Sequence, residues 1–222
     1  MPYLSQLTSV RGLAAWWVVM FHFREALPMA KESVIYRILD HGYLAVDFFF
    51  VLSGFIIFLN YYRSFQIFTW GSVADFLVKR IARIYPLHLM VMLLYVINPI
   101  VILLLSSAAE LGGRYDLDYY VASLLLVQNW GIFDAVAWNI PEWSISTEFG
   151  AYLAFPFMAI LTNRLVHSIW LHMLLIFVLC AAIALLFRTV GYTSLGNGIP
   201  DIGLARCVLE FGIGVLTASL FM

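Results

Sequence analysis

The stretch VRGLAAWWVVMFHF, residues 10–23, decides the fold class, because it is an apolar, helix-forming segment with a charge near its start and a histidine near its end. Arg11 and His22 lie eleven positions apart, and eleven helical steps of about 100° put both side chains on one stripe of a helix, about 16 Å apart. That distance is too long for an ion pair. It suits one group that holds a substrate and another that does chemistry. Because ionisable side chains are costly in a lipid-embedded helix, their default interpretation is functional.

The composition of the 222 residues excludes an ordinary soluble domain. The chain is 64% hydrophobic and 11% charged, with a mean hydropathy of +0.94, whereas a soluble domain is about 25% charged. A net charge of −1 gives no general attraction for nucleic acid. Cys180 and Cys207 lie in apolar runs without a C-x-x-C or Cys/His pattern, so we expect neither a disulfide framework nor a metal site.

Seven apolar stretches approach the roughly 20 residues that a membrane-spanning helix needs. They cover residues 10–23, 43–62, 84–105, 119–133, 143–161, 169–186 and 203–222. The sequence therefore predicts an all-α polytopic transmembrane helix bundle of about seven spans, as one domain over residues 1–222. Pro99 should kink the third span. The last span reaches Met222 without a polar or aromatic flank, so we expect the chain to lack further C-terminal spans.

The segment 63–83 is mixed in polarity, and we expect it to lie at the membrane interface with a helix start at Thr69 or Ser72. It carries four basic residues, whereas the polar loop 24–41 carries three. Under the positive-inside rule this difference favours a cytoplasmic N-terminus, with residues 10–23 retained as the first span rather than removed as a signal peptide.

Polar side chains inside the predicted spans need a partner or a wet cavity. Asp47 begins the second span, and it either pairs with Arg11 to lock two helices together or belongs to a site. In the fifth span, Ser144, Glu148 and Tyr152 follow an i, i+4, i+8 pattern and share one face. Glu148 can orient a histidine, bind a hydroxyl or act as general acid/base; the alternative is a hydrogen bond between helices.

Two pairs of residues that contain arginine also need an interpretation. Arg80 and Arg83 share a helix face, and two guanidinium groups there suit phosphates, although an interfacial anchor explains them as well. Arg206 and Glu210 are spaced for a simple pair within one helix.

Other polar residues have plainer interpretations. The run Gln128, Asn129 and Trp130 can bind a sugar hydroxyl or hydrogen-bond between helices. We expect four histidines near predicted span ends to be interfacial rather than catalytic. They are His41, His88, His167 and His172.

Several stretches, taken in order and spacing, resemble the membrane acyltransferase family 3. They are Arg11-Gly12-x-Ala14 followed by His22, AVDFFFVLSGFII at 45–57, KRIARIYPLH at 79–88, EWSISTEFGAY at 142–152, and R-x-x-x-EFGIGVL from Arg206. Members of that family are integral-membrane O-acyltransferases. They move acetyl or other short acyl groups from acyl-CoA onto hydroxyls of cell-surface or secreted carbohydrates.

The resemblance implies a role for each matching residue. His22 matches the catalytic histidine and Arg11 the arginine of the first span. Arg80 and Arg83 match paired arginines that engage the acyl-CoA donor. A Trp-Ser…Glu motif is matched by Trp143, Ser144, Glu148 and Tyr152. The family usually has about ten spans, so the resemblance also implies that the final ones are missing here.

The mechanism we expect uses a neutral His22 as the base that deprotonates an acceptor hydroxyl while it attacks the thioester, with Glu148 or Asp47 orienting the ring. An alternative makes His22 an acyl carrier. Acyl-CoA is then a donor substrate, with no bound cofactor; the acceptor is a carbohydrate or lipid-linked glycan, and the location is a bacterial inner (plasma) membrane. The competing interpretations are a transporter or proton relay, and an inactive fragment of the enzyme.

Overall fold

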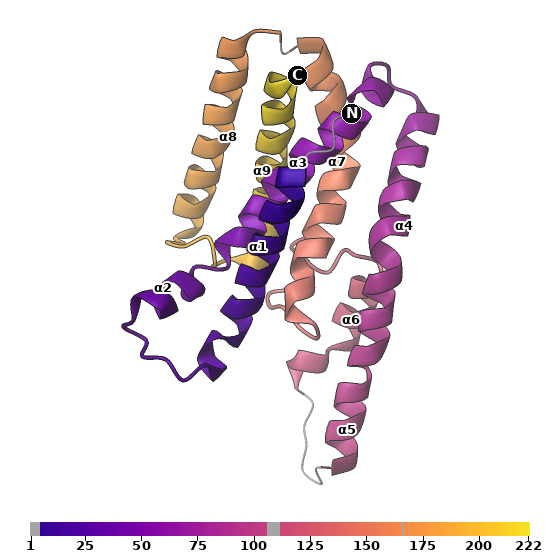
Figure 1. The fold of residues 1–222 in the computed structure, drawn as a ribbon. Coiled ribbons are helices and arrows are strands. Elements are labelled where there is room, and N and C mark those ends of the chain that lie inside the picture. The colour runs from indigo at the N-terminus through magenta and orange to yellow at the C-terminus, as the bar shows by residue number, and fades with distance from the viewer. Residues whose placement is uncertain (1–4, 106–111, 166) are drawn as a thin grey trace.

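The computed structural model describes residues 5–105, 112–165 and 167–222, and this part of the chain is helical without a strand (Figure 1). The all-α fold class is therefore confirmed. The α-helices are α1 (Ser5–Phe23), α2 (Val34–Asp40), α3 (Leu44–Tyr61), α4 (Trp70–Tyr95), α5 (Ile97–Leu105), α6 (Leu117–Leu124), α7 (Trp143–Leu165), α8 (Ile169–Val190) and α9 (Ile199–Phe221). Short 3-10 helices are η1 (Arg24–Ala26), η2 (Tyr62–Phe65), η3 (Gly113–Tyr115) and η4 (Ile140–Glu142).

Among the described residues, five helical segments are long and apolar enough to cross a membrane. They are Leu44–Phe65, Trp70–Leu105, Ile140–Leu165, Ile169–Val190 and Ile199–Phe221. The protein is accordingly an integral membrane protein. Helix α1 has 19 residues but is not among the five, because Arg11, His22 and a polar first turn dilute its apolar character. The exact number of spans remains a prediction.

The predicted span at 119–133 is wrong. Helix α6 has only 8 residues, far short of the roughly 20 that cross a bilayer. The chain then turns at Leu126 and Trp138, which both have left-handed backbone angles (φ 60° and 53°). The loop is held by Asn129, whose side chain donates to the Ile199 carbonyl at 2.8 Å, and by Trp130, whose indole donates to the Ser146 carbonyl at 3.1 Å. Hydrogen bonds to other segments of the protein therefore account for the polar side chains of Asn129 and Trp130.

The third span begins earlier than predicted. Thr69 caps α4 by accepting a hydrogen bond from the Ser72 amide at 3.1 Å, so residues 70–83 join one long helix instead of an interfacial segment. The helix continues through Pro86 and is interrupted at Val96 before α5. Pro99 lies three residues further on and has no N–H to donate to the carbonyl one turn back, so the helix is interrupted close to the predicted kink.

The centre of the molecule is the contact between α3 and α9, with α7 and α8 packed against α9. Two glycines let the backbones approach. A Cβ at Gly54 would lie 2.0 Å from the Phe211 carbonyl oxygen, and one at Gly214 would lie 1.9 Å from that of Val51. Small residues commonly allow such close contact between membrane helices. The aromatic core around this contact includes Phe58, Phe76, Phe155 and Phe211, all fully buried.

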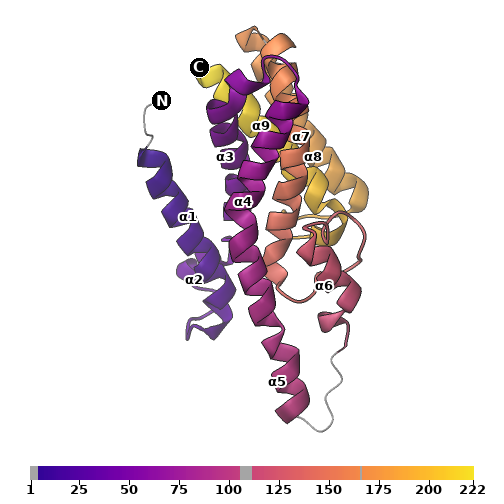
Figure 2. The same ribbon diagram turned by 90° about the vertical axis from the view of Figure 1, so that its right-hand side faces the viewer.

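Helix α1 lies at the edge of this bundle, where it packs against α3 and against the short α2 and η1 (Figure 2). The segment after α1 is tied back to it by the Trp17 indole, which donates to the Ile38 carbonyl at 2.8 Å. An ion pair between Arg24 and Asp40 at 2.7 Å closes the same loop. The beginning of α1, the α3–α4 connection and the end of α9 share one end of the molecule (Figure 1). The predicted orientation would put all three in the cytoplasm.

Two histidines differ from expectation. His88 and His172 are 2% and 6% exposed, so they are buried rather than interfacial. His172 on α8 donates from Nδ1 to the Ser168 carbonyl at 2.9 Å, and its Nε2 lies 3.1 Å from the Ser219 hydroxyl of α9. His41 and His167 are exposed. Histidine buries readily when both ring nitrogens have partners, which sequence position alone does not reveal.

Candidate active site

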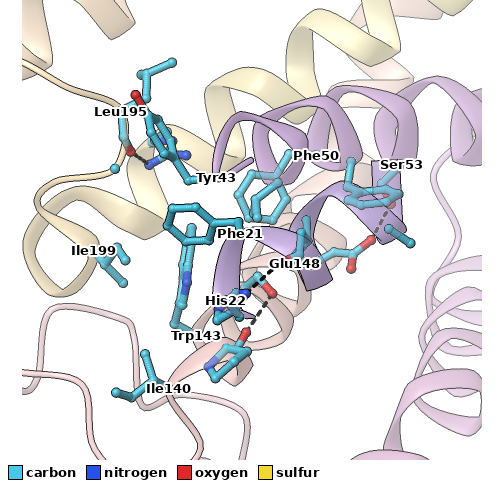
Figure 3. Close-up of a pocket in the computed structure, with 18 of the residues that line it drawn as sticks. Phe21, His22, Tyr43, Phe50, Ser53, Ile140, Trp143, Glu148, Leu195 and Ile199 are labelled. Carbon is cyan, nitrogen blue, oxygen red and sulfur yellow. Dashed lines mark hydrogen bonds between the residues drawn. The ribbon is translucent and has the colours of Figure 1, made fainter. Parts of the chain in front are cut away.

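A cavity of about 480 Å³ lies between α1, α3, α7 and the loop that leads into α9 (Figure 3). Both polar residues of the α1 stripe, Arg11 and His22, line it. Trp143, Ser144 and Glu148 of α7 face them across the space. We call this space the large cavity. The structure thus brings together residues that lie more than 120 positions apart in the chain.

A second space of about 160 Å³, the small cavity, lies between α3, α4 and α7. Arg80, Arg83 and Tyr152 line it. The two cavities share four lining residues: Arg11, Phe49, Ser53 and Glu148. The two cavities are therefore adjacent, with Ser53 and Glu148 in contact between them. We call the two together the joint cavity; the two arginines of α4 line one end of it and His22 lines the other.

His22 is placed near the C-terminal end of α1 as an exposed side chain on the cavity wall. Its Nδ1 lies 2.8 Å from the Val18 carbonyl oxygen. A carbonyl can only accept a hydrogen bond, so Nδ1 carries the proton of the neutral ring. The other nitrogen, Nε2, then has a free lone pair. The Phe21 ring meets the imidazole edge-on, with centroids 5.2 Å apart. The backbone carbonyl therefore orients the ring, whereas a carboxylate was expected to do so.

Glu148 is held by two hydroxyl donors. The Ser53 hydroxyl of α3 donates to its Oε1, and the Tyr152 hydroxyl donates to the same oxygen at 2.8 Å. These two contacts on one oxygen tie α7 to α3 and fix the position of the carboxylate between the two cavities. The predicted stripe of α7 is present, since Ser144 and Glu148 line the large cavity while Glu148 and Tyr152 line the small one.

Asp47 is engaged by Arg206 of α9 and not by Arg11. The Arg206 Nε donates to the Asp47 carboxylate at 2.6 Å, and Glu210 lies 3.5 Å from the same nitrogen. The expected pair of Arg206 and Glu210 within α9 therefore forms. It belongs to a larger buried cluster, because Arg206 also binds Asp47 of α3. The Arg206 guanidinium also lies 5.6 Å from the Trp143 ring centre and donates to the Leu195 carbonyl. This cluster supports the wall of the large cavity beside Trp143.

The basic pair of α4 lines the small cavity. Arg80 is half-buried, donates to the Tyr61 hydroxyl at 3.1 Å and lies 5.3 Å from the centre of that ring. Arg83 is exposed at the wall of the same cavity. Lys79 is also exposed, but it pairs with Asp75 at 2.7 Å. The geometry thus separates two guanidinium groups that line the small cavity from one ammonium that lines neither of the two cavities.

Sequence reasoning missed three residues of this site. Ser53 joins the two cavities, Tyr43 lines the large cavity and accepts from the Ser194 hydroxyl at 3.1 Å, and Arg206 lines it as well. Ser53 is a lone hydroxyl inside an apolar span, which is the feature that would have singled it out. Within the described ranges, no three His, Cys, Asp or Glu side chains come together as a metal site requires.

Membrane helices with a histidine, arginines and a carboxylate around a joint cavity define an integral membrane protein with an enzyme-like site. The model of the acyltransferase 3 family, described as an acyltransferase domain, matches residues 4–222. The chain belongs to this family, which confirms the resemblance inferred from its motifs.

The curated relatives of this chain include bacterial proteins. Acyltransferase MdmB of Streptomyces mycarofaciens is 34% identical over 173 residues, which cover 75% of this chain and 42% of that protein. A protein of Staphylococcus aureus (strain COL) with the provisional name O-acetyltransferase SACOL0978 is 24% identical over 165 residues, covering 70% of this chain and 24% of its own length. The chain thus spans less than half the length of these relatives. No solved structure matches it.

Proposed function

We propose that this protein is a membrane O-acyltransferase that transfers a short acyl group, acetyl in the first instance, from acyl-CoA to a hydroxyl of a cell-surface or secreted carbohydrate. The observation that carries the proposal is the joint cavity, which has His22 at one end and Arg80 and Arg83 at the other. Membership of the acyltransferase family and bacterial relatives support it. The location that follows is the bacterial inner membrane.

The arginine end suits the donor. Arg80 and Arg83 both face the small cavity, and Arg11 borders both cavities. Planar guanidinium groups bind phosphate oxygens through paired, charge-assisted hydrogen bonds. The phosphates of acyl-CoA would therefore bind at this end. Its thioester arm would extend past Ser53 toward His22.

The histidine end supplies the chemistry. The free Nε2 of His22 would take the proton from the acceptor hydroxyl while the oxygen attacks the thioester carbonyl. The carbon–sulfur bond then breaks, and the proton passes from the ring to the departing CoA thiolate. Glu148 lines the same space as a carboxylate and would favour the transient imidazolium.

The acceptor would bind beside α7. Trp143, which is 7% exposed, would contact a sugar with the part of its indole that lines the cavity, and Ser144 would contact it with its hydroxyl at the same wall. Asp47 acts on this end through Arg206, which lies against Trp143. The wall is otherwise apolar, with Phe49, Phe50 and neighbouring side chains, which excludes water from the thioester.

The experiment compares the purified chain with His22→Ala in lipid nanodiscs supplied with radiolabelled acetyl-CoA and a carbohydrate acceptor. A positioned base typically contributes 10²–10⁴-fold, so the variant should lose about that much turnover while remaining folded. His41→Ala is the matched control, because its Nδ1 makes the same contact with a carbonyl one turn back, at 2.7 Å from Arg37. Mass spectrometry of the acceptor identifies the product. Acylation by His22→Ala at the unaltered rate would disprove the assignment.

A further inference from the structure

A buried ion pair lies outside the joint cavity and has no place in the mechanism above. His88 of α4 and Glu142 of η4 are 2% and 3% exposed, and His88 Nδ1 contacts the Glu142 carboxylate. The other ring nitrogen, Nε2, lies 3.0 Å from the Ser123 carbonyl oxygen at the end of α6. One side chain thus joins three segments: α4, the end of α6 and the residues just before α7.

The hydrogen-bond partner of His88 shows which of its ring nitrogens carries a proton. The Ser123 carbonyl only accepts, so Nε2 must donate. Nδ1 lies in contact with the Glu142 carboxylate, without a hydrogen bond of regular geometry. The ring and the acid are therefore paired with each other, either as two ions of opposite charge or as two neutral groups. This explains how two ionisable groups are buried here without the full cost of buried charge.

The pair lies directly before the residues of α7 that are proposed to bind the acceptor. Glu142 is followed directly by Trp143 and Ser144, which both line the large cavity. The Ser144 hydroxyl donates to the Pro141 carbonyl at 3.1 Å, which closes the first turn of α7. Trp143 in turn packs edge-on against Phe50, with ring centres 5.8 Å apart. Holding Glu142 against α4 therefore fixes the position from which both cavity-lining side chains extend.

From this arrangement we infer that His88 and Glu142 are a positioning pair, which sets the start of α7 so that Trp143 and Ser144 meet the acceptor. The inference rests on the proposed function for its kinetic consequence. Neither His88 nor Glu142 lines the small cavity, where Arg80 and Arg83 lie, although His88 belongs to the same helix. The pair should thus govern use of the acceptor and leave donor binding unchanged.

The test uses four variants that separate hydrogen-bond matching from simple packing. His88→Gln sets an amide oxygen against the Glu142 carboxylate and should disrupt the contact. Glu142→Leu leaves His88 Nδ1 without a partner and should do the same. Glu142→Gln keeps a donor toward Nδ1 of a neutral ring and should be tolerated. In the double variant H88Q/E142Q, the two amides pair with each other and the first still reaches the Ser123 carbonyl, so the contact should be restored.

The first measurement is hydrogen exchange of the full chain in nanodiscs, which needs no activity. Amides of residues 142–147 should exchange at least tenfold faster in H88Q and E142L and at the wild-type rate in E142Q and H88Q/E142Q, because local opening sets this rate. Amides of α3 and α9 should keep their rates in all four. Glu25→Leu and His167→Gln, which replace exposed residues of the same types, are the controls.

The second measurement is acyl transfer. H88Q and E142L should lose about tenfold or more in turnover or in apparent acceptor affinity, since small misplacements of binding groups have effects of this size. Their affinity for acetyl-CoA should stay within about twofold of wild type, because the contacts at the arginine end are unaltered. Loss of activity in the double variant equal to that in H88Q, wild-type exchange in E142L, or a parallel fall in donor affinity would each overturn the inference. An inactive wild-type chain would instead count against the proposed function, and the exchange pattern would still decide the positioning role.

Discussion

Helix α1 and the α3–α9 pair differ in how tightly the protein holds them. At the centre, backbone meets backbone at Gly54 and Gly214, and Arg206 is 2% exposed. At the edge, Arg11 and His22 of α1 are exposed. The helices that form the rigid centre, α3 and α9, are therefore not the helix that carries the proposed reactive group, His22 of α1. The central helices set the shape of the cavity, and a lightly packed helix brings the histidine to it.

The largest expected effect comes from a methyl group at the central contact. Gly214→Ala places a Cβ 1.9 Å from the Val51 carbonyl oxygen, so the two backbones must separate, at a cost of about 3 kcal/mol or more. Gly12→Ala is the control on α1, where nothing lies within 4 Å of the added atom; there the helix should gain up to about 1 kcal/mol. Chemical unfolding in mild detergent measures both. Equal effects at the two positions would remove the distinction between centre and edge.

A smaller effect is expected from the charge cluster of the centre. Arg206→Gln leaves the carboxylates of Asp47 and Glu210 buried without their cation, which should cost about 3 kcal/mol. Asp47→Asn should cost less, because Glu210 remains 3.5 Å from the guanidinium. Measuring the free energy of unfolding of both variants shows which substitution destabilises the protein more. If Asp47→Asn were the more damaging change, Glu210 would not share the charge of Arg206.

Two exposed cations of α4 differ in whether they line the small cavity. Arg83→Gln should weaken acetyl-CoA binding about tenfold, the usual effect of losing a charge-assisted hydrogen bond. Lys79→Gln removes an equal charge one turn away, where the exposed pair with Asp75 contributes little, and should change affinity less than twofold. Binding is measured by calorimetry with the chain in nanodiscs. Similar losses in the two variants would indicate general attraction by positive charge rather than a site.

The smallest expected effect lies in the loop after α1. A hydrogen bond from the Tyr36 hydroxyl, at 2.5 Å, and the nearby Lys31 ammonium hold the pKa of Glu25 below its ordinary value of 4.5. A lowered carboxyl pKa stabilises the fold above the unfolded value, and this contribution is lost as pH falls through the folded value. Tyr36→Phe should therefore lower the thermal midpoint slightly near pH 7.

The difference between Tyr36→Phe and wild type should vanish once the pH has fallen below the folded pKa of Glu25. Thermal unfolding at a series of pH values checks this. A difference that is constant across the series would show that the Tyr36 hydroxyl acts through packing and not through Glu25.

Much of the site was predictable because its residues stand out chemically. Arg11, His22 and Glu148 are ionisable groups in apolar segments, and Arg83 follows Arg80 by three positions; spacings of i+3, i+4 and i+11 are enough to assign such residues to helix faces. Asp47 shows the limit of this reasoning. Its need for a partner was clear from its position, but Arg11 and Arg206 were equally charged, and only the packing of α3 on α9 selects between them.

The prediction of a membrane span at 119–133 was wrong for a related reason. Its composition is apolar enough for a membrane helix, but the chain turns after α6 because the residues that follow hydrogen-bond to Ser146 and Ile199. These contacts come from helices that lie later in the sequence. Periodicity within one segment carries no information about them.

Hydropathy was enough to predict an all-α membrane protein, and the order and spacing of the quoted motifs were enough to indicate the acyltransferase 3 family, because both are properties of the chain. The tertiary structure decided which side chains meet: the joint cavity, the Asp47–Arg206 contact and the buried His88–Glu142 pair each require helices far apart in the sequence to pack together. Burial and hydrogen-bond partners depend on that packing, because they are set by neighbours in space and not by neighbours in the chain.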